Sequence, residues 1–317
     1  MKGGEILVSI VGTVGRVAVV PTALAGWNVA RAIAVLRPRD LADSAWIRYC
    51  LESPPAQRQM QLRKTDTVQA TLNLRDLKRI QVPYPPTPER VRIAGVLGYL
   101  DDLLDTNRRI ADDCTTLWRV IVRSALVDAI NSAPLTELAD FVNGKNFTKG
   151  ASGQGRPVIR TPEVRRGPEA GTVRSDAAAG DANIAREGDT LFVWSGSLTV
   201  GRWMWEEGLI NQHVFKVVPK RDVPAWLVFA LIEYQMPWFL SVAADKATTM
   251  GHIKREHLDA AVPVPLSTEI GRLGPIIEPL WNEALQCGVT AQQLTRARNE
   301  LLPLLVSGQV RVVDVAA

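Results

Sequence analysis

The amino-acid sequence repeats itself at a distance of about 180 residues, and this repeat constrains the fold more than any other feature. Residues 4–9 read GEILVS, and residues 188–193, which lie 184 positions later, read GDTLFV. The motif VPYP at 82–85 recurs as VPVP at 262–265, 180 positions later. Between these motifs the offset falls smoothly, as small loop deletions would produce. The chain is therefore predicted to contain two copies of one supersecondary plan.

A second pattern follows each proline-containing motif, with mostly apolar residues separated alternately by four and three positions. In the first copy the series is Ile93, Leu97, Leu100, Leu104, Asn107, Ala111, Cys114, Trp118, Ile121 and Ala125. In the second copy it is Leu273, Ile277, Leu280, Ala284, Cys287, Ala291, Leu294, Arg298, Leu301 and Leu305. This spacing is typical of a coiled-coil seam. Each copy is predicted to be a β-rich globular unit followed by one long helix, which makes the chain an α+β protein.

The two patterns divide the chain into four segments. We expect a first globular unit at 1–85, a helical segment at 86–133, a second globular unit at 134–266, and a second helix with a tail at 267–317. These boundaries follow from the prolines that close each globular unit, because proline interrupts regular structure.

The two helices are expected to differ in regularity. The first should run from Glu89 to about Asn131. Pro275 and Pro279 are expected to break or kink the first turns of the second helix, so that its dependable part begins near Leu280. It should end around residues 307–308, where glycine suits a helix C-terminus.

The globular segments also differ in length before the shared motif. In the second unit fifty-four residues, 134–187, precede Gly188, whereas three residues precede Gly4 in the first. By the logic of a shared plan, about 50 residues of the first unit are expected to be absent. A truncated gene, a start placed too late, or completion by another segment would each explain the difference.

Charge is distributed unevenly along the 317 residues. The formal net charge of +4 is too mild by itself to indicate a nucleic-acid partner. Residues 1–85, however, contain 12 Lys and Arg against 6 Asp and Glu, whereas residues 134–266 contain 15 of each. This local excess suits a phosphate-binding surface, although an ordinary solvated basic face would explain it equally.

Residues that would support catalysis or metal binding are few. Three cysteines and three histidines occur without CxxC or HExxH spacing, so neither a metal site nor a cofactor is predicted. Ser195 lacks the preceding glycine of a nucleophile elbow, and residues 12–15 are too short for a P-loop. The scattered cysteines fit a reducing compartment such as the cytoplasm.

Two apolar segments bear on cellular location. The N-terminus loosely resembles a signal peptide, but Glu5 precedes its apolar run and Arg16 interrupts it. The stretch from 223 to 244 contains Glu233 and Pro237, and it is predicted to be a buried helix and not a membrane span. We therefore expect a cytoplasmic protein without a membrane partner.

Loops that combine glycine, hydroxyl side chains and cations are better candidates for function. Residues 9–16 and 195–202 follow apolar strands at matching places in the repeat, and residues 63–71 match residues 245–255. A basic loop at 145–149 belongs to the second unit alone. A plain tight hairpin is the alternative interpretation of the two glycine-rich loops.

These loops have the chemistry of DNA contacts. Lys and Arg can bind phosphates, while Gln69, Thr249 or His252 can reach base edges. The predicted DNA-binding residues are Ser9, Thr13, Arg16, Lys64, Thr67, Gln69, Lys145, Asn146, Lys149, Ser195, Ser197, Arg202, Lys246, Thr248, Thr249, His252 and Lys254.

In this order, the motifs resemble the DNA specificity (S) subunit of type I restriction-modification systems. The resemblance rests on GEILVS at 4–9 with GTVG at 12–15, VPYPP at 82–86, RIA at 92–94 with LDD at 100–102, TTMGHI at 248–253, and LLPLLVSG at 301–308. It covers essentially the whole chain, and the ordered repeat is that family's own plan.

The resemblance implies two target recognition domains, the first N-terminally truncated, each of which reads one half of a split site in double-stranded DNA. It implies that two antiparallel coiled-coil helices act as a spacer and dock methyltransferase (M) subunits, which restriction (R) subunits join. Such a subunit has no catalysis of its own. Seam positions expected to be exposed to the partner are Leu97, Leu104, Asn107, Trp118, Leu294 and Leu301.

Two other classes of protein remain open at this point. A DNA-modifying enzyme with its own nuclease or methyltransferase site would need a glycine-rich cofactor loop or a cluster of carboxylates and lysine, and neither is evident. A coiled-coil scaffold whose globular units bind protein is the other class, and the basic loops argue mildly against it.

Overall fold

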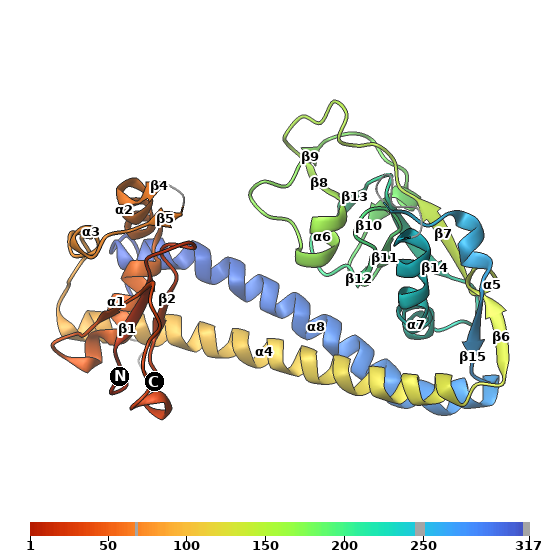
Figure 1. Cartoon of the computed structure of the whole chain (residues 1–317), viewed down its shortest axis with the longest axis horizontal. Helices are drawn as coiled ribbons and strands as arrows, with labels where there is room; N and C mark the ends of the chain where they lie inside the picture. Colours follow the sequence, from red (N-terminus) through yellow and green to blue (C-terminus); the bar gives the residue numbers. More distant parts are fainter. Residues whose placement is uncertain (67–68, 245–250, 313–317) are drawn as a thin grey trace. The chain divides into compact units, whose positions relative to one another are not determined.

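The computed structural model describes residues 1–66, 69–244 and 251–312 (Figure 1). It divides into two compact units. Unit 1 comprises Met1–Thr106 and Gln293–Ala317, and unit 2 comprises Asn107–Gln292. Two long helices contribute to both units, α4 (Thr87–Val127) and α8 (Ser267–Val306).

Unit 1 is built around a three-stranded antiparallel sheet with the order β2-β1-β3. Its strands are β1 (Ile6–Ser9), β2 (Val17–Val19) and β3 (Ile33–Leu36), and a short hairpin is formed by β4 (Thr65–Asp66) and β5 (Ala70–Thr71). Its other helices are η1 (Thr22–Leu24), η2 (Leu41–Asp43), α1 (Ser44–Glu52), α2 (Pro54–Arg63) and α3 (Leu74–Leu77). Alternate side chains of β1, Ile6 and Val8, are fully buried and pack on Met60 and Leu72, as the period of two in a half-buried strand requires.

The ends of the two long helices close a second cluster in unit 1. Ile93 and Leu97 of α4 lie in one buried cluster with Leu302 and Leu305 of α8 and with Trp46 of α1. Early residues of α4 therefore pack on late residues of α8, so the two helices run antiparallel in this unit.

Unit 2 contains two four-stranded sheets and a two-stranded ribbon. One sheet has the order β12-β11-β14-β7, the other β10-β13-β8-β9, and β15 pairs with β6. The strands are β6 (Asn131–Pro134), β7 (Ala139–Asn143), β8 (Arg156–Ile159), β9 (Arg174–Ser175), β10 (Ile184–Ala185), β11 (Thr190–Val193), β12 (Thr199–Arg202), β13 (Gly208–Ile210), β14 (Val214–Pro219) and β15 (Ala261–Val264).

The helices of unit 2 are α5 (Leu135–Leu138), α6 (Thr161–Arg166), η3 (Asp181–Asn183), α7 (Ala225–Ala244) and η4 (Arg255–Asp259). Of these, α7 is long and apolar enough to cross a membrane, but half of its apolar window is buried inside the unit. Its Phe229 and Phe239 lie in one core cluster with Trp118 and Trp281 of the long helices. This burial favours the interpretation of α7 as a core helix.

The sequence repeat is also a structural repeat. In unit 1, Ile6 lies opposite Val19 and Leu36, and in unit 2 Thr190, 184 positions after Ile6, lies opposite Arg202 and Val217. The order β2-β1-β3 therefore corresponds to β12-β11-β14, with the same strand register.

The helical seam lies where its spacing predicts. All twenty seam residues of α4 and α8 are buried or partly buried. In unit 2, Trp118 of α4 contacts Trp281 of α8 edge to face, with ring centroids 5.1 Å apart. The alternating spacing thus places one face of each helix against the other.

The prediction that Pro275 and Pro279 break the second helix is wrong, because α8 is continuous from Ser267. Both prolines are exposed, whereas Leu273 and Ile277, on the other face of the same turns, are 4% and 0% exposed. Burial of that face offsets the lost hydrogen bonds and the ring clash of each proline. The helix ends at Val306, and Gly308 follows with a φ of 75°, as expected for a C-terminal glycine.

Candidate nucleic-acid interface

In unit 1 the loop after β1 is joined to the strand β5 by main-chain contacts. The Gly12 N–H donates to the Ala70 carbonyl oxygen at 2.9 Å, and the Leu72 N–H donates to the Ile10 carbonyl oxygen at 2.8 Å. An isolated β-bridge links position 11 to position 71 between these bonds. Two loops that lie far apart in the sequence therefore form one bridged pair.

Unit 2 repeats this arrangement bond for bond. The Gly196 N–H donates to the Gly251 carbonyl oxygen at 2.9 Å, and the Ile253 N–H donates to the Trp194 carbonyl oxygen at 3.1 Å. The bridge here joins Ser195 to His252. The first loops are offset by 184 positions and the second loops by 181. Both predicted pairs of loops are thus brought together, one pair in each unit.

The glycine-rich loop of unit 1 is held by hydrogen bonds between the Ser9 hydroxyl and the backbone of the loop. The Ser9 hydroxyl donates to the Thr13 carbonyl oxygen and accepts from the Arg16 N–H, the latter at 2.9 Å. Gly12 has a φ of 75°, a left-handed conformation that side chains with a Cβ rarely adopt. The side chains of Thr13 and Arg16 are exposed. The loop therefore presents a hydroxyl and a guanidinium on a fixed main chain.

Glu5 and Asp189, which occupy matching places in the repeat, each accept hydrogen bonds from the backbone of a neighbouring turn. Glu5 accepts hydrogen bonds from the Lys2 and Gly3 N–H groups at 2.7 and 2.8 Å, and the first of these bonds is the main cause that lowers the pKa of its carboxyl. Asp189 accepts from the Arg186 N–H at 2.7 Å. Each carboxylate thus binds the backbone three residues earlier, which explains its presence without a catalytic role.

The bridged pair of unit 2 lines a pocket of about 870 Å³. Its lining residues are Arg160, Thr161, Pro162, Arg165, Arg166, Ser195, Gly196, Ser197, Asn211, His213 and Gly251. Hydroxyl, amide and imidazole groups from the sheet thus face three guanidinium groups from α6 and the residue before it. This combination of cations with neutral donors and acceptors suits DNA phosphates and base edges.

The three arginines of the pocket are not equivalent. Arg160 is paired with the buried carboxylate of Glu163, with Nη2 2.9 Å from Oε1. Arg166 lies 3.7 Å from the exposed Glu169. Arg165 is exposed and forms no ion pair with the part of the chain that the structure describes. Arg165 and Arg166 are therefore the cations most available to an anionic ligand.

Sequence reasoning missed Arg165, Arg166 and His213. The two arginines lie in residues 134–187, which have no counterpart in the first copy, so comparison of the copies could not select them. The adjacent Arg pair at the end of a six-residue helix was the available signal. The pair lies near Ser195 because α6 packs on β11 and β12, the strands on either side of the Ser195 loop.

Most predicted DNA-binding residues lie on accessible surface. Thr13, Arg16, Gln69, Lys145, Asn146, Lys149, Ser197 and Lys254 are exposed, and Ser9, Lys64, Ser195 and His252 are partly buried. Thr67, Lys246, Thr248 and Thr249 lie outside the described residues. The basic loop at 145–149 adjoins the pocket, because position 145 forms a bridge with Asn211.

Arg202, a predicted DNA-binding residue, is directed away from the bridged loops. Its Nη1 atom donates to the Trp281 carbonyl oxygen at 2.5 Å, and its guanidinium lies 4.0 Å from the centre of the Trp281 ring. Burial lowers its pKa to about 10. The side chain is directed to α8 and helps to attach the sheet to the helix.

The seam residues predicted to contact a partner are buried or partly buried within this chain. Leu97, Leu104 and Trp118 are 0%, 6% and 2% exposed. The seam residues Asn107, Leu294 and Leu301 are partly buried. The seam of each helix is used within the chain, so little of it is left for another protein.

Another face of α4 carries exposed apolar side chains. In unit 2 they form two pairs spaced by seven, Ile110 and Leu117, and Val120 and Val127, with exposed fractions from 39% to 76%. We call these four residues the outer stripe. Apolar residues at heptad spacing are typical of the contact face of helix pairs.

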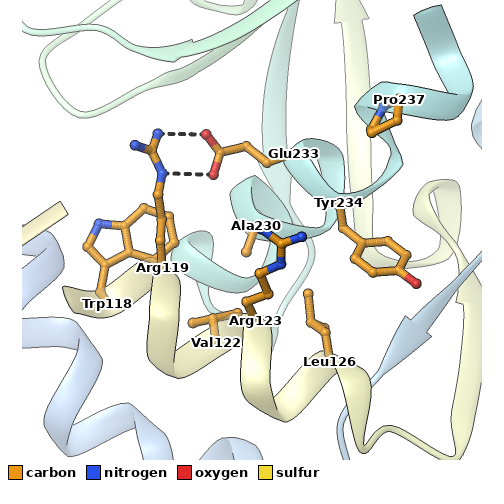
Figure 2. Close-up of a pocket in the computed structure, with 9 residues that line it drawn as sticks. All are labelled: Trp118, Arg119, Val122, Arg123, Leu126, Ala230, Glu233, Tyr234 and Pro237. Atoms are coloured by element: carbon orange, nitrogen blue, oxygen red, sulfur yellow. Dashed lines mark hydrogen bonds and ion pairs between the residues drawn. The ribbon is translucent and has the colours of Figure 1, made fainter. Parts of the chain in front are cut away.

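A groove of about 300 Å³ lies between α4 and α7 in unit 2 (Figure 2). Trp118, Val122 and Leu126 of α4 line it, and Arg119 and Glu233 form a bidentate ion pair at its rim, at 3.0 and 2.6 Å. It is a gap in helix packing lined by both apolar and polar side chains, with a neutralised pair of charges on one side. Within the described part of the chain, no group of three or more His, Cys, Asp or Glu is arranged to hold a metal ion.

Comparisons with known proteins agree with this architecture. Residues 1–113 match the family model for the type I restriction modification DNA specificity domain. The type I restriction enzyme EcoBI specificity subunit of Escherichia coli is 26% identical over 151 residues, which are 46% of this chain and 32% of that protein. The match thus spans about a third of the curated relative.

One solved structure shares the fold, and a second is more distantly similar. The S subunit of a type I restriction-modification system from M. genitalium is 16% identical, with a TM-score of 0.60, over 96% of this chain and 83% of that one. The HsdS subunit from Thermoanaerobacter tengcongensis is 17% identical, with a TM-score of 0.36, over 98% and 82% of the two chains.

Two copies of a β-rich unit, each with a bridged pair of polar loops and each followed by a long helix, define an α+β repeat protein. Residues 1–113 match the type I restriction modification DNA specificity domain, and the chain is similar in sequence and fold to specificity subunits of type I restriction-modification systems.

Proposed function

We propose that this chain is a sequence-specific DNA recognition subunit of a type I restriction-modification complex. The observation that carries the proposal is the bridged pair of loops, which recurs with the same hydrogen bonds in both units. One polar surface in each unit, formed by the bridged pair of loops and called the platform below, suits a protein that reads two half-sites of one split DNA sequence. Residues 1–85 and 134–266 would act as target recognition domains, with 86–133 and 267–317 as the helical segments.

Phosphate contacts and base contacts would come from different groups of the platform. Arg16 in unit 1 and Arg165 and Arg166 in unit 2 are exposed cations suited to phosphates. Gln69 and Ser197 are exposed polar side chains on the bridged loops and suit base edges. In both units the exposed groups proposed to contact DNA are cations and neutral hydrogen-bonding side chains. This supports a role in DNA recognition without a catalytic step in this chain.

Methyl transfer and cleavage would then belong to M and R subunits in the same cytoplasmic complex. The outer stripe of α4 is the surface of unit 2 best suited to an M subunit, because its four apolar side chains are exposed at heptad spacing. This role replaces the seam residues as the docking face. A membrane takes no part in the proposal.

Selection of bound duplexes from a random-sequence library would test the function directly. The purified chain, alone and with M subunits, should enrich a bipartite sequence, and log affinity should fall linearly with log salt concentration. Replacement of residues 134–266 by the corresponding unit of a relative should change one half of the enriched sequence. Failure to enrich any sequence, or a change in both halves, would contradict the proposal.

A further inference from the structure

A further cavity of unit 2 lies where the sheet meets the two long helices. Its volume is about 310 Å³, and it is lined by α4, α8, α6 and α7 together with β12 and the loop after β12. Its lining residues all lie within Asn107–Gln292, the range of unit 2. Four of them are the aromatic residues Trp118, Trp205, Phe229 and Trp281. A cavity of this size with aromatic walls is typical of sites for small molecules.

The charges around this cavity are all positive. Arg119, Arg165 and Arg202 line it, and none of its lining residues that the structure describes is an Asp or a Glu. Arg119 is neutralised by its bidentate ion pair with Glu233 (Figure 2). Arg165 and Arg202 form no ion pair with the described part of the chain, so the cavity holds two cations without a counter-charge.

The guanidinium of Arg202 has hydrogen-bond donors that are not used. Its Nη1 atom donates to the Trp281 carbonyl oxygen, but its Nε atom is buried without an acceptor. Its Nη2 atom donates no hydrogen bond to the described residues. The carboxylate of Glu187 acts on this guanidinium through space, but it is exposed and accepts a hydrogen bond from Gln286. Because a buried cation without a partner is costly, an anion in the cavity would be stabilising.

The unused atoms of Arg202 form the edge with which arginine binds planar anions. Nε and Nη2 of Arg119 donate to the two carboxylate oxygens of Glu233, at 3.0 and 2.6 Å. The same two atoms of Arg272 donate to Glu269, at 2.9 and 2.6 Å. Carboxylate and phosphate groups both fit this paired geometry. Arg202 thus keeps free the pair of donors that other arginines of unit 2 use for a carboxylate.

The aromatic walls of the cavity are held in place by packing. Trp281 contacts Trp118 and Phe229 edge to face, at 5.1 and 5.2 Å. The Trp205 ring packs on Gly167 at the end of α6, where a Cβ would lie 2.2 Å from the ring, and it lies 4.9 Å from the ring of Trp203. Fixed rings of this kind favour a planar aromatic group as ligand.

We propose that this cavity binds a small organic anion in which a planar aromatic ring carries a carboxylate or phosphate group. The anionic group binds Arg202 and Arg165, and the ring packs on the aromatic walls. Arg165 also lines the pocket beside the bridged loops, whereas Arg166 lines that pocket and not this cavity. The inference goes beyond DNA recognition, and it is tested without DNA.

Isothermal titration calorimetry of the full chain is the experiment. The probes are 2-naphthoate and adenosine 5′-monophosphate, and 2-naphthol and adenosine are their uncharged counterparts. At least one anion should bind saturably with one site per chain, and roughly tenfold or more tightly than its counterpart, as expected for hydrogen bonds to a charged group. The anion that binds shows whether the site takes a carboxylate or a phosphate. A folded chain that binds neither anion would overturn the proposal, as would equal affinity for an anion and its counterpart.

Variants of the arginines place the ligand in this cavity. Arg165→Gln, at an exposed side chain, should weaken binding roughly three- to tenfold, because one charged partner is lost. Arg166→Gln is the matched control and should leave the affinity unchanged. Arg202→Met fills a similar space without the charge and should weaken binding about tenfold or more, with the fold checked by circular dichroism. Equal effects of Arg165→Gln and Arg166→Gln, or undiminished binding by folded Arg202→Met, would contradict the site.

Discussion

Arg298 on α8 and Asp101 on α4 form a 2.8 Å ion pair between Nε and Oδ1. The same carboxylate accepts bonds from Arg48 and from the Tyr49 hydroxyl, each at 2.9 Å. The second arm of Arg298 binds Glu52. Five side chains from three helices thus form one charged network in unit 1.

Aromatic rings occupy the matching place in unit 2. The positions 180 residues from Asp101 and Arg298 hold Trp281 and Trp118. Their rings lie edge to face at 5.1 Å, and both contact Phe229, which matches Tyr49 in the repeat. The same crossing of two helices is therefore stabilised by ion pairs in one copy and by aromatic packing in the other.

The network of unit 1 can be tested by Arg298→Leu. The Arg298 side chain is 15% exposed, so its loss would leave Asp101 and Glu52 partly buried with one remaining cation. We expect a loss of about 2–4 kcal/mol in the free energy of unfolding, measured by chemical denaturation. Arg296→Leu is the control, because its pair with Glu300 is mostly exposed and should change stability by less than about 0.5 kcal/mol. Equal effects would contradict the role of the network.

The aromatic cluster of unit 2 can be tested by Trp118→Ala. Trp118 is 2% exposed and packs on two other rings, so truncation leaves a large cavity. We expect a loss of about 3–5 kcal/mol, measured by denaturation and localised to unit 2 by hydrogen exchange. The neighbouring Leu117 is 50% exposed, and Leu117→Ala should cost less than about 1 kcal/mol. A mild effect of Trp118→Ala would show that the cluster is not part of the rigid core.

The pocket of unit 2 makes a prediction for DNA binding. Arg165→Ala should weaken binding and reduce the slope of log affinity against log salt by about 0.9, the contribution of one phosphate. Arg123→Ala removes an exposed arginine of the same unit that lines the groove of Figure 2 and not the pocket. That control should keep the wild-type slope in the absence of M subunits. An unchanged slope for Arg165→Ala would exclude Arg165 from the DNA interface.

Acid should weaken unit 1 through Asp43. Hydrogen bonds from the Tyr84 hydroxyl and from Arg90 hold the pKa of Asp43 below its ordinary 3.8. A carboxyl with a lowered pKa in the fold stabilises above its unfolded pKa and loses that contribution as the pH falls through its folded pKa. Denaturation should therefore show Asp43→Asn less stable than wild type at pH 7, with a gap that narrows below about pH 4.

Asp105→Asn provides the reference for that experiment, because Asp105 is exposed on α4. It should follow the wild-type profile across the same pH range. A gap between Asp43→Asn and wild type that stays constant from neutral to acid pH would argue that packing, and not the charge of Asp43, accounts for the loss.

The sequence alone predicts the features that depend on periodicity. The offset between the two copies aligns the sequence of β1 with that of β11 and identifies the loops that correspond. The four-and-three spacing identifies the buried faces of α4 and α8. These patterns are local in each copy and can be read without knowledge of the tertiary structure. The predicted break at Pro275 and Pro279 does not occur. The local rule for proline does not take into account that the opposite face of the helix is buried.

The candidate site was predictable only in part. The bridged loops follow from the repeat, but Arg165 and Arg166 lie near Ser195 through the packing of α6 on β11 and β12, a tertiary contact that no local pattern encodes. The location of the Arg202 side chain could not be predicted for a related reason. Its matching residue Arg16 is exposed on the loop, whereas Arg202 ends β12 and contacts Trp281 of α8. Equal places in a repeat did not imply equal surroundings.

The bridged loops are fastened by N–H and carbonyl groups, which nearly every residue type possesses. The side chains at positions 13, 69 and 197 therefore contribute little to the stability of the fold. A substitution there changes what the surface contacts and leaves the scaffold intact. A protein of this design can acquire a new target by exchanging a handful of exposed residues, and the two copies can diverge in preference independently of each other.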